Sequence, residues 1–342
     1  MKICIIGAGH IGHALVVMLA NKGHEINMLS SHLKNVDEIV GYYEDNTIVG
    51  RVNKISDKPE EVVSEAELII LSVPAFARLE VLKRIKDHIR DDAIIGAMPG
   101  IAGFDLEIDQ VLGGRDNLTV FSAQRVPCIA RIIEPGKSVR LYIKKSMAIA
   151  VNENKAVIKN LLENLLGLNI YLLDSFLEVN LSNSNPILHS ARLYRLFKDY
   201  KLGIFYPEPI SFYELWDDLS SEILIEMDNE FMEIVNKLGL NNIKSLKEHY
   251  EVRTVSEMTQ KIKSIKAFKG IYAPMIKVDQ GYIPNFNSRY FTEDVEFGLK
   301  FNLEYGLKLC VDVNVMSKVY KCLHTKIDLN KLFFFQEREG KN

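Results

Sequence analysis

Six residues near the N-terminus have the types and the spacing of a dinucleotide-binding turn. They follow the apolar run 2–6 and match the pattern Gly-x-Gly-x-x-Gly. In such a turn the first glycine permits the tight bend, the second lets the backbone approach a pyrophosphate, and the third lets the helix pack against the strand. The N–H groups at the helix start then hold the phosphates. We therefore expect a dinucleotide site, the alternative being a glycine-rich turn without a ligand. The residues are Gly7, Ala8, Gly9, His10, Ile11 and Gly12.

The residues after the second strand-like run bear on which dinucleotide is bound. An NAD site usually places Asp or Glu about 20 residues past the glycines, where it binds the ribose hydroxyls. This chain has no acid there and carries Ser30, Ser31, His32 and Lys34 instead. Because hydroxyl and basic side chains can accommodate a 2′-phosphate, the sequence favours NADP(H), with NAD(H) still possible. The alternative for the two serines is that they cap a following helix.

Two further turns are candidates for the walls of a nicotinamide pocket. Val73 and Pro74 end one apolar run, and the segment 98–103 follows another. The carboxyl ends of parallel strands line the ligand crevice of a doubly wound sheet, so we expect both turns to lie beside the cofactor.

A second group of residues, much later in the chain, could perform acid–base chemistry. His189 follows Asn185 and Pro186, and Arg289 lies shortly before Asp294. A histidine titrates near neutrality and can both give and take a proton. A guanidinium can bind a carboxylate through two parallel hydrogen bonds. Each residue also has a structural explanation, since a lone helical histidine is often structural and acids favour the start of a helix. Spacing alone leaves both interpretations open.

The elements that must position these residues alternate in the first half of the chain. Short apolar runs alternate with helical periodicity, for example over 10–22 and 78–89, which indicates a parallel sheet covered by helices. Residues 139–143 and 147–151 are interpreted as a hairpin at its edge. The other strand-like runs are residues 2–6, 25–29, 67–73, 93–97, 118–121 and 170–173.

From residue 174 onward helical periodicity dominates and strand-like runs are few. We therefore predict an α/β fold in which a doubly wound Rossmann domain over residues 1–173 precedes an all-helical domain over residues 174–342. The aromatic segment 332–336 is expected to be a docking helix or a subunit contact, so a homodimer is possible.

Composition limits the classes of function. The chain has 342 residues and a net charge of −3, and such a charge is unlike that of proteins that bind nucleic acid unaided. No apolar run approaches the roughly 20 residues of a membrane helix, and the N-terminal stretch is interrupted by His10 and His13, unlike a signal peptide. The four cysteines show neither disulfide nor zinc-site spacing. We expect a soluble, cytoplasmic protein with no metal and no nucleic-acid or membrane partner.

The combined motifs resemble the octopine/nopaline (opine) dehydrogenase family. The likeness is carried by the glycine motif, by Asn-Pro-x-x-His at 185–189 and by Arg-Tyr-Phe-x-Glu-Asp at 289–294. The segment 127–131, which reads Pro-Cys-Ile-Ala-Arg, is also similar. Members of that family pair a Rossmann domain with a helical domain. They condense an α-keto acid with the amine of an amino acid, and NADH or NADPH supplies the hydride.

The resemblance implies roles for individual residues. His189 would be the general acid/base, Asp294 its carboxylate partner and Arg289 a carboxylate-binding group, while Asn185 and Arg131 would contact the substrate. Two other interpretations stay open. The chain could be a 2-hydroxyacid or polyol-phosphate dehydrogenase of the related superfamily, which needs no amine, or a dinucleotide-sensing protein without turnover.

Overall fold

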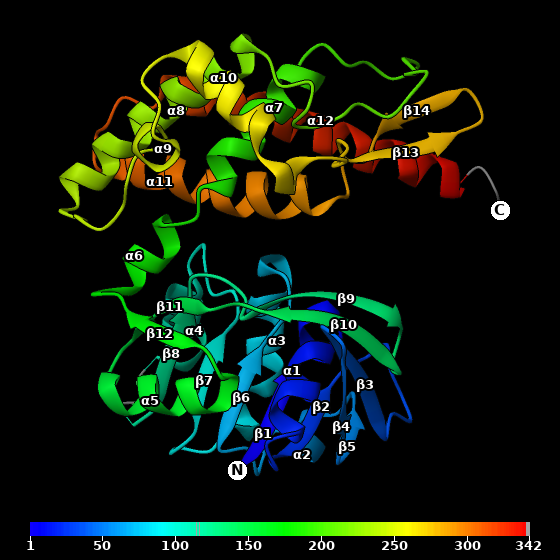
Figure 1. Cartoon of the computed structure of the whole chain (residues 1–342), viewed down its shortest axis with the longest axis vertical. Coiled ribbons are helices and arrows are strands. Elements are labelled where there is room, and N and C mark those ends of the chain that lie inside the picture. The colour runs from blue at the N-terminus through cyan, green and yellow to red at the C-terminus, as the bar shows by residue number, and fades with distance from the viewer. Residues whose placement is uncertain (114, 116, 340–342) are drawn as a thin grey trace. The chain divides into compact units, whose positions relative to one another are not determined.

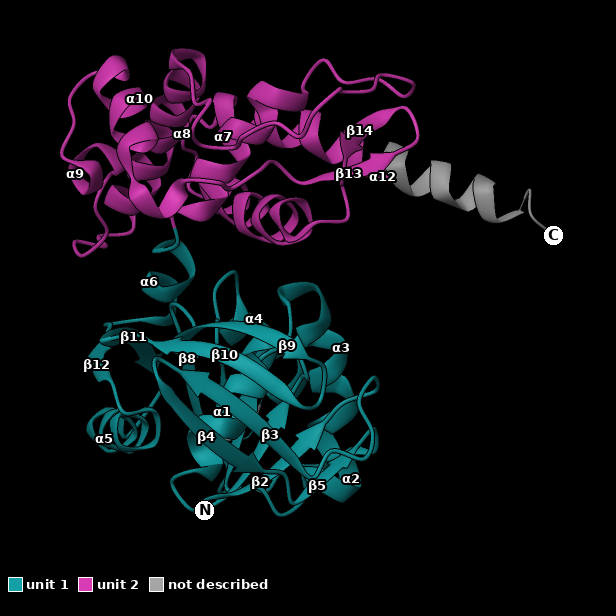
Figure 2. Cartoon of the chain, turned by 45° about the vertical axis from the view of Figure 1, so that its right-hand side comes forward, with its two compact units in different colours: residues 1–183 teal, residues 184–342 magenta. Residues whose placement is uncertain are grey.

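The computed structural model describes residues 1–113, 115 and 117–339, and within 329–339 it describes the backbone alone. The chain divides into two compact units, Met1–Asn183 and Ser184–Asn342 (Figures 1 and 2). The domain boundary predicted at residue 173 lies earlier, directly after β12 (Asn169–Leu172). The short helix α6 (Phe176–Leu181) therefore groups with the first unit.

An eight-stranded sheet forms the centre of the first unit. Its order is β12-β11-β8-β7-β6-β1-β2-β5, and every pairing is parallel except that of β8 with β11. The strand order reverses between β1 and β6, and in open α/β sheets ligands bind at that point. The strands not yet delimited are β1 (Lys2–Ile6), β2 (Glu25–Leu29), β5 (Lys54–Ser56), β6 (Leu68–Leu71), β7 (Ile94–Ala97), β8 (Thr119–Ala123) and β11 (Ser146–Val151).

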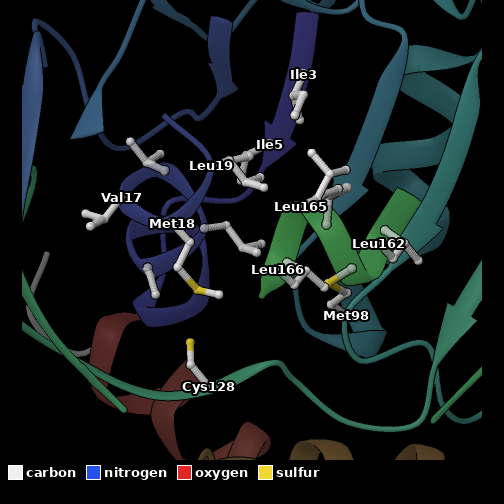
Figure 3. Packing of buried hydrophobic residues seen from close by; sticks show 14 of the residues in the cluster. Ile3, Ile5, Val17, Met18, Leu19, Met98, Cys128, Leu162, Leu165 and Leu166 are labelled. Carbon is white, nitrogen blue, oxygen red and sulfur yellow. The ribbon is translucent and has the colours of Figure 1, made fainter. Parts of the chain in front are cut away.

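Helices cover both faces of this sheet, because alternate residues of β1 enter two different cores. Ile3 and Ile5 pack in the cluster that includes residues of α1 and α5, which Figure 3 shows. Cys4 and Ile6 pack in a second cluster with α3 and α4. A strand that is buried on both faces has a continuous apolar sequence. The largely parallel sheet with helices on both faces confirms the predicted Rossmann fold. The helices are α1 (His10–Ala20), α2 (Pro59–Val62), α3 (Ala75–Ile85), η1 (Lys86–His88), α4 (Phe104–Leu112) and α5 (Lys155–Leu166).

A second sheet, of order β4-β3-β10-β9, packs against α1. A Cβ added at Gly50 would lie 2.6 Å from Val17 Cα, so the sheet meets the helix backbone directly. The hairpin predicted over 139–143 and 147–151 is wrong: β10 pairs with β9 and β3, whereas β11 pairs with β8 and β12. β10 instead pairs with β9, the strand directly before it in the chain, and β11 joins the central sheet. The new strands are β3 (Glu38–Tyr43), β4 (Asn46–Arg51), β9 (Cys128–Glu134) and β10 (Ser138–Ile143).

The second unit is helical, as predicted, with a two-stranded hairpin as the exception within its described part. α7 packs against η3, α8 and α12, and η3 is a π-helix. The tail segment 332–336 falls in α12, where the side chains lie outside the described residues. Among the described residues, none of the helices combines the length and apolar character needed to cross a membrane. The elements are α7 (Asn185–Phe197), α8 (Asp218–Lys237), α9 (Leu246–Tyr250), α10 (Val255–Ser264), η2 (Lys266–Phe268), β13 (Met275–Val278), β14 (Gly281–Pro284), η3 (Tyr290–Leu299), α11 (Lys300–Lys308) and α12 (Asn314–Glu339).

Candidate active site

The glycine turn joins β1 to α1 and is tightly packed at two of its three glycines, Gly7 and Gly12. Gly7 has a φ of +103°, which favours glycine, and its N–H donates to Leu29 O at the end of β2 over 3.1 Å. A Cβ at Gly12 would lie 2.0 Å from Gly7 O, so the helix packs directly on the turn. Around Gly9, by contrast, no described atom outside the immediate chain lies within 4 Å of a Cβ position. The backbone at Gly9 is therefore open to a close ligand.

The start of α1 is suited to an anion. Gly9 is its N-cap, and among the described residues no side chain caps the helix and no acid lies in its first turn. His13 donates from Nδ1 to Gly9 O over 3.0 Å, and its Nε2 accepts from Gly136 N at 2.8 Å. Burial lowers the pKa of His13, so this ring is neutral and ties the turn to the second sheet.

Three predicted cofactor contacts lie in or beside that turn. The side chain of Val73 lies beside it, since a Cβ at Gly7 would be 2.8 Å from Val73 Cγ1, and Pro74 forms the N-cap of α3. His10 accepts from Ile132 N on β9 through Nδ1 at 3.0 Å, which brings β9 to the helix start. Arg131, the preceding residue on β9, is exposed.

The residues after β2 form a turn that leads to β3. The buried Ser30 Oγ accepts from His32 N and Leu33 N, each at 3.2 Å, whereas Ser31, His32 and Lys34 are exposed. No helix follows within the described residues up to β3, so the helix-capping alternative for the serines is wrong. Because its hydroxyl and basic groups are exposed, this turn is able to bind a phosphate.

His189 lies at the centre of the second group. Its Nδ1 is 2.8 Å from Asp294 Oδ2, and its Nε2 is 2.9 Å from the hydroxyl of Tyr213. An ionised carboxylate can only accept, so Nδ1 carries the ring proton of the neutral imidazole. Nε2 then accepts from the Tyr213 O–H. The His189 side chain is 11% exposed and that of Asp294 is 16% exposed, which keeps the pair largely out of water.

Two helices bring this pair together. α7 carries His189, with Pro186 in its first turn, and η3 carries Asp294. A Cβ at Gly298 would lie 2.3 Å from Pro186 Cγ, so a glycine lets η3 approach the start of α7 closely. Asn185 is the first residue of α7, and the exposed Arg289 is the N-cap of η3. A π-helix bonds residue i to i+5, so its winding places residues 289 and 294 one turn apart.

Aromatic rings surround the imidazole. The centroid of Tyr290 lies 4.6 Å from that of His189, and Phe212 packs edge-on at 5.8 Å. Burial raises the pKa of Tyr213 and, with the nearby Asp294, that of Tyr290, so both phenols are neutral near pH 7. Tyr213 was not among the residues predicted from the sequence. It lies in a loop before α8, and no local spacing connects it with His189.

Known proteins resemble both units. A family model for the alpha-helical domain of NAD/NADP octopine/nopaline dehydrogenase matches residues 172–327. A second model, described as NADP oxidoreductase coenzyme F420-dependent, matches residues 2–100. Octopine dehydrogenase of Pecten maximus is 27% identical over 335 residues, which covers 87% of this chain and 83% of that protein. Tauropine dehydrogenase of Arabella iricolor is 26% identical over 332 residues, covering 86% and 83%.

Solved structures agree with the fold. An octopine dehydrogenase with NADH and L-arginine superposes with a TM-score of 0.86 at 24% identity, covering 96% of this chain and 90% of that one. An NADP+-bound yersinopine dehydrogenase gives a TM-score of 0.76 at 11% identity, covering 95% and 90%. These two structural likenesses establish the two-unit fold.

Proposed function

We propose a specific reaction for this chain, which belongs to the octopine/nopaline dehydrogenase family of NAD(P)-dependent oxidoreductases acting on CH–NH bonds. It reductively condenses an α-keto acid with the amine of an amino acid, or catalyses the reverse oxidation. The observation that carries this proposal is the largely buried His189–Asp294 pair, 2.8 Å apart, on the two motifs of the helical unit. This pair would have no chemical purpose in a dinucleotide sensor without turnover.

His189 is the proposed general acid/base. In the reductive direction its imidazolium gives a proton to the carbinolamine hydroxyl that leaves as water, and in the oxidative direction the neutral ring takes a proton back. Asp294 accepts from Nδ1–H, which fixes the tautomer and stabilises the imidazolium that forms. Arg289 binds the keto acid carboxylate, and Asn185 and Arg131 supply further polar contacts to the substrates.

The first unit is proposed to hold NADP(H) in preference to NAD(H). Its open backbone at Gly9 and the uncapped start of α1 fit a pyrophosphate, and the exposed Ser31, His32 and Lys34 fit a 2′-phosphate. Ser30 organises that turn, and Val73 and Pro74 line the nicotinamide side. When bound, the dinucleotide supplies the hydride, while the protein supplies orientation and charge.

The test is the loss of nicotinamide absorbance from NADPH, and separately from NADH. Each is assayed with pyruvate, 2-oxoglutarate or glyoxylate, with and without pooled amino acids. We expect oxidation that requires both keto acid and amine and that is faster with NADPH. Oxidation with keto acid alone would contradict the proposal in favour of a hydroxyacid dehydrogenase, and cofactor binding without any turnover would favour a sensor.

A further inference from the structure

The nitrogen of His189 that must exchange protons is covered by another side chain. Because Asp294 takes the Nδ1 side, Nε2 is the nitrogen left for chemistry, and the Tyr213 hydroxyl lies 2.9 Å from it. Tyr213 is 4% exposed, so this contact is buried. A substrate that approaches Nε2 from outside meets the phenol oxygen on the way.

The ring of Tyr213 is held in place by its neighbours. It stacks on Phe268 with centroids 4.0 Å apart and an interplanar angle of 15°, and it packs edge-on against Phe212 at 4.8 Å. Trp216, which donates its indole N–H to Ser221 Oγ at 2.9 Å, stacks farther away, with centroids 6.2 Å apart. Moving the phenol away from His189 would break these contacts together.

The loop that carries Tyr213 is held by α7 itself. Arg192, one helical turn after His189 and buried, donates to the carbonyls of Phe212 at 2.8 Å and Leu215 at 2.5 Å. Its Nη1 also donates to Ser220 Oγ at 3.0 Å. The same helix therefore fixes the imidazole and, through buried charge-assisted hydrogen bonds, the loop that places the phenol on it.

We propose that Tyr213 is a third member of the acid–base chain and that protons reach and leave His189 Nε2 through its hydroxyl. The inference rests on the proposed function and adds to it a residue that conducts the proton. The order of the chain is Asp294, His189, Tyr213, substrate.

The proton transfers balance in both directions. In oxidation the substrate gives its proton to the phenol oxygen while the Tyr213 O–H proton moves to Nε2, leaving a neutral phenol and an imidazolium beside Asp294. In reduction the imidazolium gives its Nε2 proton to the phenol oxygen as the phenol gives its own to the substrate. Burial raises the pKa of Tyr213, in agreement with transfer through a phenol that stays neutral at rest.

The matched experiment compares Tyr213→Phe with Tyr200→Phe. Tyr200 is also buried in the helical unit, where its ring packs on Tyr206 and Phe286 instead of on His189. We expect kcat of Tyr213→Phe to fall about 100-fold, with KM and NADPH affinity changed less than about threefold. We expect Tyr200→Phe to keep the wild-type kcat.

Other outcomes would overturn the inference. An unchanged or higher kcat in Tyr213→Phe would mean that the phenol only blocks Nε2 and moves aside. A loss of thermal stability with kcat and KM equally affected would indicate a structural role alone.

A second measurement needs no variant. In mixtures of H2O and D2O, transfer of two protons in one step makes kcat/KM depend on the deuterium fraction along a curve, whereas one proton gives a straight line. A straight line in the wild-type enzyme would refute the relay even if Tyr213→Phe fails to fold. Absence of wild-type turnover on any keto acid and amine would instead refute the proposed function.

Discussion

At the residue scale, a substitution of Asp294 tests whether its contact with His189 Nδ1 is catalytic or only structural. Asparagine at 294 keeps the shape, but its amide can donate to Nδ1 and it has no charge to stabilise an imidazolium. We expect Asp294→Asn to lower kcat at least ~100-fold with little change in the melting temperature or in NADPH affinity. Steady-state kinetics and thermal denaturation measure this. Glu296→Gln is the control, because Glu296 lies on the same π-helix and pairs with His324 instead. Full activity in Asp294→Asn would contradict the assignment.

Removal of the imidazole is the more drastic change. We expect His189→Ala to abolish turnover while NADPH affinity, measured by fluorescence titration, stays near the wild-type value, because the dinucleotide motifs lie in the other unit. His324→Ala is its matched control: His324 also pairs with a carboxylate, Glu296, at 2.8 Å, but on the α12 side of η3. Retained activity in His189→Ala, or its loss in His324→Ala, would be against the proposed role.

The sequence predicted His189 and Asp294 as a pair only through their motifs, and it missed Tyr213. A motif reports residues that are close along the chain, whereas the Tyr213–His189 contact depends on a loop that Arg192 folds back onto α7. An arginine in an amphipathic helix reads as a solvent-exposed charge. Here it is 2% exposed, and its buried hydrogen bonds could not be predicted from composition or spacing.

At the scale of elements, the turn between β1 and α1 offers a sharp pair of variants. Alanine at Gly12 would place its Cβ 2.0 Å from Gly7 O, so we expect Gly12→Ala to lower the melting temperature and abolish dinucleotide binding. Alanine at Gly9 meets no described neighbour within 4 Å, so Gly9→Ala should keep the melting temperature. It should nevertheless bind NADPH at least ~10-fold more weakly, because a methyl group would then stand at the proposed position of the pyrophosphate. Calorimetry and titration separate the two effects, and wild-type NADPH affinity in Gly9→Ala would argue against this site.

Local sequence patterns predict the parallel strands of the central sheet better than they predict the pairing of β10 and β11. β6 is apolar throughout and β1 is apolar after Lys2, as expected for strands that are buried on both faces. β10 and β11 are separated by only two residues, which predicts a hairpin, but β10 packs on α1 and β11 joins β8. The π-helix could not be predicted from the sequence either, because no residue propensity distinguishes it from an α-helix. In α geometry the residues 289 and 294 would be rotated by roughly 140° relative to each other.

At the scale of the whole molecule, each unit contains one group of the candidate site residues. The glycine turn and β9 belong to the first unit, and the His189–Asp294 pair belongs to the second. This division could be predicted from the change in periodicity near residue 174, because apolar spacing reports which face of each element is buried. Both units contain buried side chains, and a buried ionisable group in either unit can make the free energy of unfolding depend on pH.

Asp228 is such a group, and the direction of its effect on the free energy of unfolding follows from its pKa. It is 3% exposed on α8 and accepts from Leu246 N at 2.7 Å, while burial raises its pKa to about 6. The folded state therefore holds a proton between about pH 4 and pH 6 that the unfolded state has already released. As pH rises through this window, this residue lowers the free energy of unfolding, by up to ~3 kcal/mol above pH 6.

Asparagine can accept the same Leu246 N–H without ever acquiring the charge. We therefore expect Asp228→Asn to match the wild type in urea denaturation near pH 4 and to exceed it increasingly up to about pH 7. Glu248→Gln is the control of opposite sign, because hydrogen bonds from Ser245 lower the pKa of the exposed Glu248. The Glu248→Gln substitution should lower the free energy of unfolding at neutral pH and have no effect on it in acid. A stability difference between Asp228→Asn and the wild type that is constant with pH would show that Asp228 does not titrate in this range.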